Sequence, residues 1–192
     1  LKSLDAISVR EKSGLQLLSK MDLYGVQVCD PVFLLKRNVW EKLAICPKGK
    51  RYLLVYDFDN NPEIRIIANT LAKKRDLKII SVYPMKGADK IYKDMGPLEF
   101  VGTILNADTV LSNSFHATAF SMIFEKDFFV VNRKESINAR MKDLLESVGL
   151  SRRLVTDSDS MDYISDSEWY NVKLLLADII EKSKRFLDSV IN

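Results

Sequence analysis

Short apolar segments alternate with longer amphipathic ones along most of the chain. Such apolar runs are typical of buried strands, and apolar residues spaced three or four apart are typical of helices. Strands are expected at residues 5–9, 26–28, 51–56, 78–83, 109–111 and 128–131. Helices are expected at residues 12–20, 62–72, 96–106, 114–124, 139–148 and 169–191, with Gly149 as a C-cap. Near-continuous apolar strands between helices predict an α/β, Rossmann-like fold: a doubly wound parallel sheet covered on both faces.

The length bounds the number of domains. A chain of 192 residues, 47% of them hydrophobic, usually forms one domain with a substantial core. We therefore expect residues 1–192 to form a single Rossmann-like domain, with 169–192 as a C-terminal packing helix. The apolar stripe of that helix is Val172, Leu175, Leu176, Ile179, Ile180, Leu187 and Val190. The polar stretch 157–168 is expected to be an exposed loop.

The first residues suggest a piece of a longer protein. The chain begins at Leu1 without a methionine and enters a predicted strand almost at once. We expect it to be one lobe of a protein whose first half is absent. Neither an apolar run of transmembrane length nor a signal peptide is present, so a cytoplasmic location, or a peripheral one at the inner face of the membrane, is expected.

The charge balance disfavours a nucleic-acid partner. The chain has 29 Lys and Arg against 26 Asp and Glu, a net charge of only +3. The clusters at 73–75 and 152–153 lie at predicted helix ends, where cations favour the helix dipole, and are expected to be solvated. Cys29 and Cys46 have no histidine or third cysteine with them and are expected to be free thiols of a reducing compartment.

The strongest candidate for chemistry is the segment from Ser112 to His116, which ends at the only histidine of the chain. It follows a predicted strand, and ligands of open α/β sheets bind outside the carboxyl ends of strands. Asn113 or Ser114 could cap the next helix, whose first turn would attract an anion. An imidazole there could transfer protons or contact a phosphate. The alternative is a capped helix with a histidine that only packs, and the residues alone leave both open.

Three arginines could take part at this edge. Arg10 directly follows a predicted strand and could bind a carboxylate or phosphate bidentately, or pair with Glu11 or another surface acid. Arg133 and Arg140 follow the strand after the histidine helix and could reach the cleft or be solvated.

The sequence gives little sign of a cofactor or metal. Neither G-x-G-x-x-G nor G-x-x-x-x-G-K-[ST] occurs, which argues against a standard dinucleotide site or P-loop. Asp57 and Asp59 resemble a metal-binding pair, but their setting, Asp-Phe-Asp-Asn-Asn-Pro, favours a turn. We therefore expect no metal and no cofactor.

The segment 107–121, Ala-Asp-Thr-Val-Leu-Ser-Asn-Ser-Phe-His-Ala-Thr-Ala-Phe-Ser, resembles the signature of the polysaccharide pyruvyl transferase family. Further agreement, in the same order, comes from residues 7–11, 30–35 before Trp40, 96–100, 138–140, 144–145 and 148–150. The resemblance spans roughly residues 5 to 153. Ala117 departs from the pattern, since the family often has glycine after the histidine, and its methyl could crowd a ligand at that turn.

This resemblance implies the C-terminal lobe of a two-lobed fold like that of GT-B glycosyltransferases. It also implies transfer of pyruvate from phosphoenolpyruvate, as a donor substrate, to a sugar of a bacterial cell-surface polysaccharide or its lipid-linked precursor, forming a ketal. His116 would be catalytic. The substrate-binding residues would be Arg10, Asn113, Ser114, Phe115, Ala117 and Arg140. The isolated lobe would be inactive. Two alternatives stay open: a glycosyltransferase lobe that binds a nucleotide sugar, and a non-catalytic lobe that binds an anion.

Overall fold

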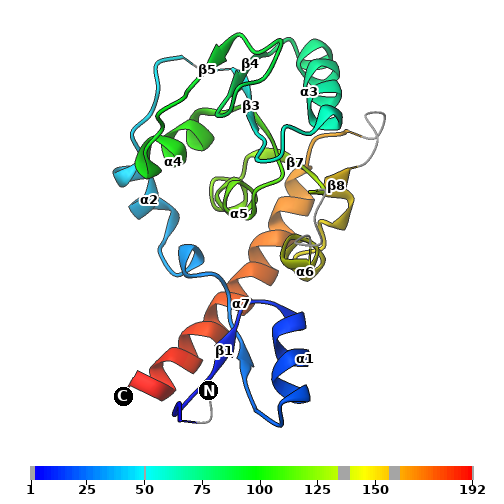
Figure 1. The fold of residues 1–192 in the computed structure, drawn as a ribbon. Coiled ribbons are helices and arrows are strands. Elements are labelled where there is room, and N and C mark those ends of the chain that lie inside the picture. Colours follow the sequence, from blue (N-terminus) through cyan, green and yellow to red (C-terminus); the bar gives the residue numbers. More distant parts are fainter. Residues whose placement is uncertain (1–2, 50, 134–138, 156–160, 192) are drawn as a thin grey trace. The chain divides into compact units, whose positions relative to one another are not determined.

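The computed structural model describes residues 3–49, 51–133, 139–155 and 161–191 (Figure 1). The chain divides into two compact units. The larger, called the sheet unit, comprises Lys36–Asn138 and Arg152–Ser165. The smaller, called the terminal unit, comprises Leu1–Leu35, Ala139–Ser151 and Asp166–Asn192.

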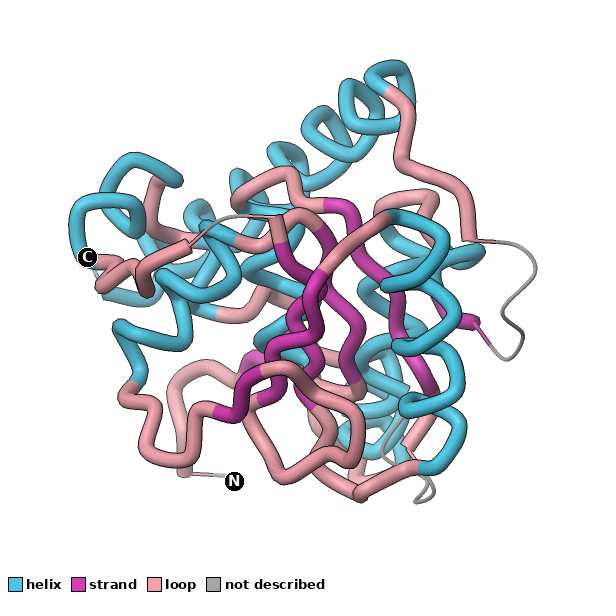
Figure 2. The backbone as a smooth tube through the Cα atoms, turned by 90° about the horizontal axis from the view of Figure 1, so that it is seen from above, coloured by secondary structure: helices cyan, strands magenta, loops and turns pink. Residues whose placement is uncertain are grey.

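The sheet unit is built on an all-parallel sheet, which confirms the predicted fold class. Among the described residues its six strands lie in the order β5-β4-β3-β6-β7-β8, and Figure 2 shows them side by side. The strands are β3 (Tyr52–Tyr56), β4 (Lys78–Ser81), β5 (Lys90–Ile91), β6 (Thr109–Ser112), β7 (Asp127–Val131) and β8 (Leu154–Val155). Counted along the chain, this is the doubly wound order 3-2-1-4-5-6, whose direction of winding reverses between the first and fourth strands. Here those strands are β3 and β6.

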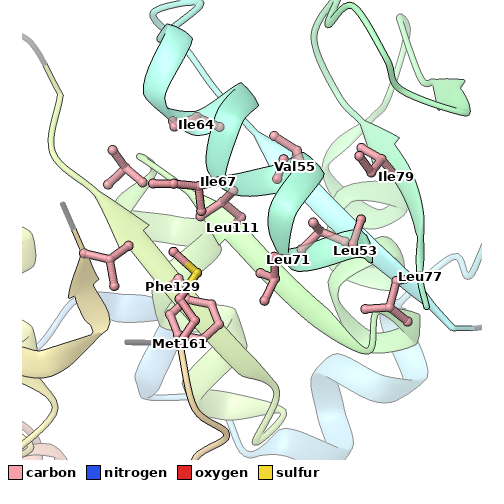
Figure 3. Packing of buried hydrophobic residues seen from close by; sticks show 14 residues of the cluster. Leu53, Val55, Ile64, Ile67, Leu71, Leu77, Ile79, Leu111, Phe129 and Met161 are labelled. Atoms are coloured by element: carbon pink, nitrogen blue, oxygen red, sulfur yellow. The ribbon is translucent and has the colours of Figure 1, made fainter. Parts of the chain in front are cut away.

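Helix α3 (Pro62–Arg75) covers one face of this sheet. Side chains alternate between the faces along a strand, so Leu53 and Val55 point the same way. They join Ile64, Ile67 and other residues of α3 in one buried apolar cluster (Figure 3). The helix begins at residue 62, as predicted. Asn61 caps it by accepting a hydrogen bond from the Glu63 N–H, and Pro62 occupies the first turn.

Helices α4 (Pro97–Asn106) and α5 (Phe115–Ile123) pack against each other and cover the other face of the sheet. The Tyr52 hydroxyl, from the opposite set of β3 side chains, donates to the Thr103 carbonyl oxygen of α4 at 2.7 Å. The sequence did not predict α2 (Arg37–Leu43), which has no buried residue, or the two-residue strands β5 and β8.

Gly102 of α4 is required by a close backbone approach. A Cβ atom at this position would lie 2.2 Å from the carbonyl oxygen of Ile45. The Ile45 N–H also donates to the Leu98 carbonyl oxygen at 3.0 Å, so the segment after α2 is seated directly on the α4 backbone. A side chain at position 102 would push the two segments apart.

The amino ends of the strands enclose a charged cluster, which we call the amino-edge cluster: Arg75, Asp127 and Arg153. The Asp127 carboxylate lies 2.5 Å from Arg75 Nη1 and 3.1 Å from Arg153 Nη1. The two arginine side chains are only 3% and 0% exposed. The prediction that the basic clusters are solvated is therefore wrong for these two residues, because both pair with a buried carboxylate far away in sequence.

The prediction of an exposed loop at 157–168 is also wrong where it can be followed. Residues 156–160 lie outside the described part of the chain. Met161 and Ile164 are buried, and the Ile164 N–H donates to Asp127 Oδ1 at 3.0 Å. The last helix begins at Asp166 rather than at Trp169.

The terminal unit contains a pair of short parallel strands and three α-helices among its described residues. Its elements are β1 (Ser8–Val9), α1 (Lys12–Lys20), β2 (Val26–Gln27), the 3-10 turn η1 (Pro31–Phe33), α6 (Ala139–Ser147) and α7 (Asp166–Ile191). A second 3-10 turn, η2 (Ser151–Arg153), links α6 to β8. The bounds of α1 match the prediction. The Gly149 C-cap is confirmed by its φ of 72° and by a hydrogen bond from the Leu150 N–H to the Leu145 carbonyl oxygen.

The apolar stripe of α7 is only partly a core stripe. Val172 and Leu176 are buried, as predicted, whereas Leu175 and Val190 are 44% and 46% exposed. In the described part of the chain, no helix combines the length and apolar character needed to cross a membrane.

Candidate active site at the carboxyl edge of the sheet

The winding of the sheet reverses between β3 and β6, and ligands of such sheets bind at the carboxyl edge beside this reversal. Tyr56 and Ser112, the last residues of the two strands, lie opposite each other in the register. The loops that follow are 57–61 after β3 and 113–114 after β6. The predicted segment around His116 therefore begins at the reversal point of the sheet.

Asn113 ties these two loops together. Its Oδ1 accepts a hydrogen bond from the Phe58 N–H at 3.0 Å, and its Nδ2 donates to Asp57 Oδ1 at 2.9 Å. The residue is only 1% exposed. Asn113 is thus a scaffold residue here, and the helix cap that it might have formed belongs to Ser114; a direct contact with substrate stays a prediction.

Asp57 forms the predicted turn. Its carboxylate accepts hydrogen bonds from the N–H groups of Asp59 at 3.0 Å and Asn61 at 2.6 Å, and the residue is buried. Among the described residues no cluster of three or more acidic, histidine or cysteine side chains could hold a metal ion.

Two serines fix the start of α5. Ser112 Oγ donates to the Tyr56 carbonyl oxygen at 3.0 Å and accepts from the Ser114 N–H at 2.8 Å. Ser114 is the N-cap, and its Oγ accepts a hydrogen bond from the Ala117 N–H at 3.4 Å. The strand, the two-residue connection and the helix are therefore joined by side-chain hydrogen bonds that are buried from solvent.

His116 is exposed at the top of this scaffold. It lies in the first turn of α5, where backbone N–H groups have no intrahelical acceptor and the helix dipole favours an anion. The half-buried ring of Phe115 meets the imidazole edge to face, with centroids 5.6 Å apart. A solvent-exposed imidazole at a helix start can exchange protons with a bound ligand, so His116 is not a core residue.

Ala117 is fully buried. Its methyl group packs inside the protein, so the expected crowding of a ligand at this turn finds no support. Its N–H serves the helix cap, as described above, and its contact with substrate stays a prediction.

Arg10 and Arg140 lie together in the terminal unit, each in an ion pair. Arg10 Nη1 lies 2.6 Å from Asp30 Oδ2, and Arg140 Nη2 lies 3.2 Å from the same oxygen. Arg140 Nε also lies 2.7 Å from Glu11 Oε1. An ion pair was thus correctly anticipated for Arg10, but its partner is the buried Asp30 and not Glu11 or a surface acid; contact of either arginine with substrate stays a prediction. The Arg10 side chain is still 41% exposed and can offer donors to a ligand.

A cavity of about 490 Å³ lies at the carboxyl ends of β1 and β2 in the terminal unit, with Arg10, Cys29 and Leu187 among its lining residues. Burial, above all, raises the pKa of the Cys29 thiol. Both cysteines are free, as expected.

The sequence analysis missed a pair of exposed aromatic rings at the carboxyl edge. Phe58 and Tyr83 are 46% and 36% exposed, and their centroids lie 5.6 Å apart. Arg133 lies over the Phe58 ring at 5.3 Å and pairs with Asp59 through two nitrogens, at 3.0 and 3.2 Å. Phe58 and Tyr83 each follow the end of a strand by two residues, and this position is the signal that could have found them.

Comparison with known proteins identifies the family of the chain. A search of curated proteins finds no match. The family model described as "Polysaccharide pyruvyl transferase" matches residues 1–135, which include Arg10 and the turn of His116 but not Arg140. With more than two thirds of its length matched, the chain belongs to the polysaccharide pyruvyl transferase family.

Proposed function

We propose that the protein containing this chain transfers pyruvate from phosphoenolpyruvate to two hydroxyls of a sugar, with His116 as the proton-transfer group. The acceptor would be a sugar of a cell-surface polysaccharide or of its lipid-linked precursor. The observation that carries the proposal is the exposed imidazole in the first turn of α5, at the reversal point of the sheet. Membership of the family supports the choice of donor.

The reaction needs a proton donor and a proton acceptor. A proton adds to the methylene carbon of phosphoenolpyruvate, and a sugar hydroxyl oxygen bonds to the neighbouring carbon and loses its proton. A second hydroxyl of the same sugar then loses its proton and bonds to that carbon, as the bond between the carbon and the phosphate oxygen breaks. The products are the cyclic ketal and inorganic phosphate. A histidine side chain titrates near neutral pH and can both give and take protons in such steps.

The donor also needs partners for two anionic groups. The first turn of α5 suits a phosphate or carboxylate, because its N–H groups and dipole favour negative charge. Within the terminal unit, Arg10 and Arg140 could bind an anion of their own, since a guanidinium matches a phosphate or carboxylate in a bidentate geometry. Each already lies beside a carboxylate, so an incoming anion would share the arginine with Asp30 or Glu11.

The test is pyruvylation by the full-length protein, with carbon-labelled phosphoenolpyruvate and a panel of lipid-linked and nucleotide-linked sugars. Replacement of His116 by alanine or glutamine should lower turnover by about 10²- to 10⁴-fold, the usual contribution of a positioned acid or base. Glutamine matters as the control, because it can hydrogen-bond but does not titrate near neutrality. Near-normal turnover by both variants would remove His116 from the mechanism.

The two alternatives predict different results in the same assay. A glycosyltransferase lobe would consume a uridine or guanosine diphosphate sugar and leave phosphoenolpyruvate untouched. A non-catalytic lobe would bind phosphoenolpyruvate without releasing phosphate. Either result with the wild-type protein would overturn the proposed function.

A further inference from the structure

A small pocket opens at the carboxyl ends of β3 and β4, beside the candidate active site. Its volume is about 250 Å³. Its lining residues come from the loops after the two strands: Asp57, Phe58, Asn60, Ser81, Tyr83, Pro84 and Met85. The function proposed above leaves this pocket without a ligand.

The pocket has aromatic walls. Phe58 and Tyr83 are exposed, with an angle of 45° between their ring planes. Tyr56 supports both from the end of β3, with ring centroids 4.8 Å from Phe58 and 5.3 Å from Tyr83. Burial and a hydrogen bond with Tyr83 raise the pKa of the Tyr56 hydroxyl, so this supporting residue stays neutral. The exposed rings are therefore held in place before any ligand arrives.

Three further lining residues are polar, beside the apolar Pro84 and Met85. Asp57 and Ser81 are buried polar residues at the ends of β3 and β4, and Asn60 is exposed on the first loop. Asn60 adopts a left-handed backbone conformation, with a φ of 47°, which an asparagine tolerates better than most residues. Ser81 Oγ donates to the Tyr83 carbonyl oxygen at 2.6 Å and the Asp57 carboxylate accepts three hydrogen bonds from the protein, so the exposed Asn60 is the polar lining residue best able to bind a hydroxyl.

We propose that this pocket binds one sugar ring of the acceptor, an inference that rests on the proposed function. A pyranose has an apolar C–H face, which packs on aromatic rings, and a rim of hydroxyls, which needs polar partners. The pocket is smaller than the roughly 300–1,000 Å³ of sites for drug-sized ligands, so it suits a single ring better than a whole nucleotide. Phosphoenolpyruvate has no ring to place on Phe58 and Tyr83.

The pocket and the histidine turn share one support. Asn113, three residues before His116, binds both the Asp57 carboxylate and the Phe58 N–H of the pocket wall. A sugar ring held on Phe58 would therefore lie on the loop next to the one that begins α5, at the same edge of the sheet. This is the edge at which its hydroxyls would be needed.

The decisive experiment separates acceptor binding from donor binding in the full-length protein. Phe58→Ala and Tyr83→Ala should each raise the KM for the acceptor about 10-fold, near the lower end of the loss caused when an aromatic side chain stacked on a nucleobase is removed. The KM for phosphoenolpyruvate should change less than about twofold. Phe58→Trp should restore the acceptor KM, and Ile66→Ala, which removes an exposed apolar side chain of α3, is the matched control. An unchanged acceptor KM in both alanine variants would overturn the inference.

A binding measurement keeps this inference separate from the proposed function. Saturation-transfer NMR of the full-length protein would use free galactose, mannose, N-acetylglucosamine and uridine as probes. We expect signals from the C–H face of a sugar in the wild type and their loss in Phe58→Ala. Sugar binding without any pyruvylation would overturn the proposed function and leave a saccharide pocket. Signals from the uracil ring alone, or from none of the probes, would overturn the pocket assignment even if pyruvylation occurs.

Discussion

The two edges of the six-stranded sheet both bury polar side chains, but they use them differently. At the amino edge, Arg75 and Arg153 both pair with Asp127. Asp127 also accepts a hydrogen bond from the Ile164 N–H, which holds that segment to the sheet. At the carboxyl edge, buried Asn113 holds two loops together, and exposed side chains lie on or beside them: Phe58 and Asn60 on the first loop, and His116 in the helix turn after the second. A buried polar residue at a strand end is therefore not a sign of function in itself. The carboxyl edge differs because its buried residues support exposed side chains, such as His116, that can contact a ligand.

The largest loss of stability should come from the amino edge. Asp127→Ala leaves two buried guanidinium groups without their carboxylate, and removing one partner of a buried ion pair costs about 3–5 kcal/mol. Urea denaturation of the full-length protein measures the loss. Turnover per folded molecule should not change, and Asp127→Asn, which keeps the shape but not the charge, should fall between wild type and alanine. A loss below about 1 kcal/mol would mean that the amino-edge cluster contributes no more to stability than an ion pair at the surface.

A smaller loss, joined to a loss of activity, is expected for Asn113→Ala. The change leaves the Phe58 N–H without its acceptor and removes one of the two hydrogen bonds to Asp57 Oδ1, at a cost of about 1–3 kcal/mol. Turnover should fall as well, since the loops lose their common support. Asn69→Ala is the matched control, because that asparagine is exposed on α3 and its side chain donates to a backbone oxygen of its own helix, that of Arg65. Full activity in Asn113→Ala would show that the active site does not depend on the hydrogen bonds of Asn113.

The helix cap should contribute less again. Ser114→Ala removes the acceptor for the Ala117 N–H and should cost about 1 kcal/mol, the usual value of an N-cap. The melting temperature of the variant measures this loss. Ser114→Thr keeps a capping hydroxyl and should recover most of the stability; if it behaves like alanine, the cap is not the reason.

The smallest change in stability is expected where the largest change in activity is proposed. His116 is exposed, so His116→Ala should alter the free energy of unfolding by less than about 0.5 kcal/mol. Denaturation of the same sample used for the pyruvylation assay provides this number. A loss of several kcal/mol would show that the imidazole supports the fold, and any drop in activity would then say little about proton transfer.

The fold could be predicted where local pattern and burial agree. The helix at Lys12–Lys20 and the start of α3 at Pro62 follow from apolar spacing and from a proline in the first turn. The helix α2 was missed because it buries no residue and so has no strong pattern. The strands β5 and β8 are too short to give a periodic signal. The acidic first turn of α7, with Asp166 and Glu168, was a usable signal for its true start.

The sequence could predict which residues follow the end of a strand, but not which of those residues lie next to each other in the site. The position of His116 after β6 required no more than the order of elements along the chain. The loop 57–61 lies beside the histidine turn because β3 pairs with β6 in the sheet. These two strands are more than fifty residues apart in the sequence, so their pairing could not be predicted from it. For the same reason, the sequence around Arg75 or Arg153 does not indicate that both residues pair with Asp127.

The brevity of the β6–α5 connection has a consequence for engineering. Only Asn113 and Ser114 separate the strand from the helix, and both are buried. Insertions, deletions and randomised codons should be poorly tolerated there, however attractive the position beside the histidine looks. Residues 82–89, between β4 and β5, form a longer connection with several exposed positions, and such loops accept changes in length and composition. A combinatorial library aimed at new acceptors belongs on that loop, with the histidine turn left as it is.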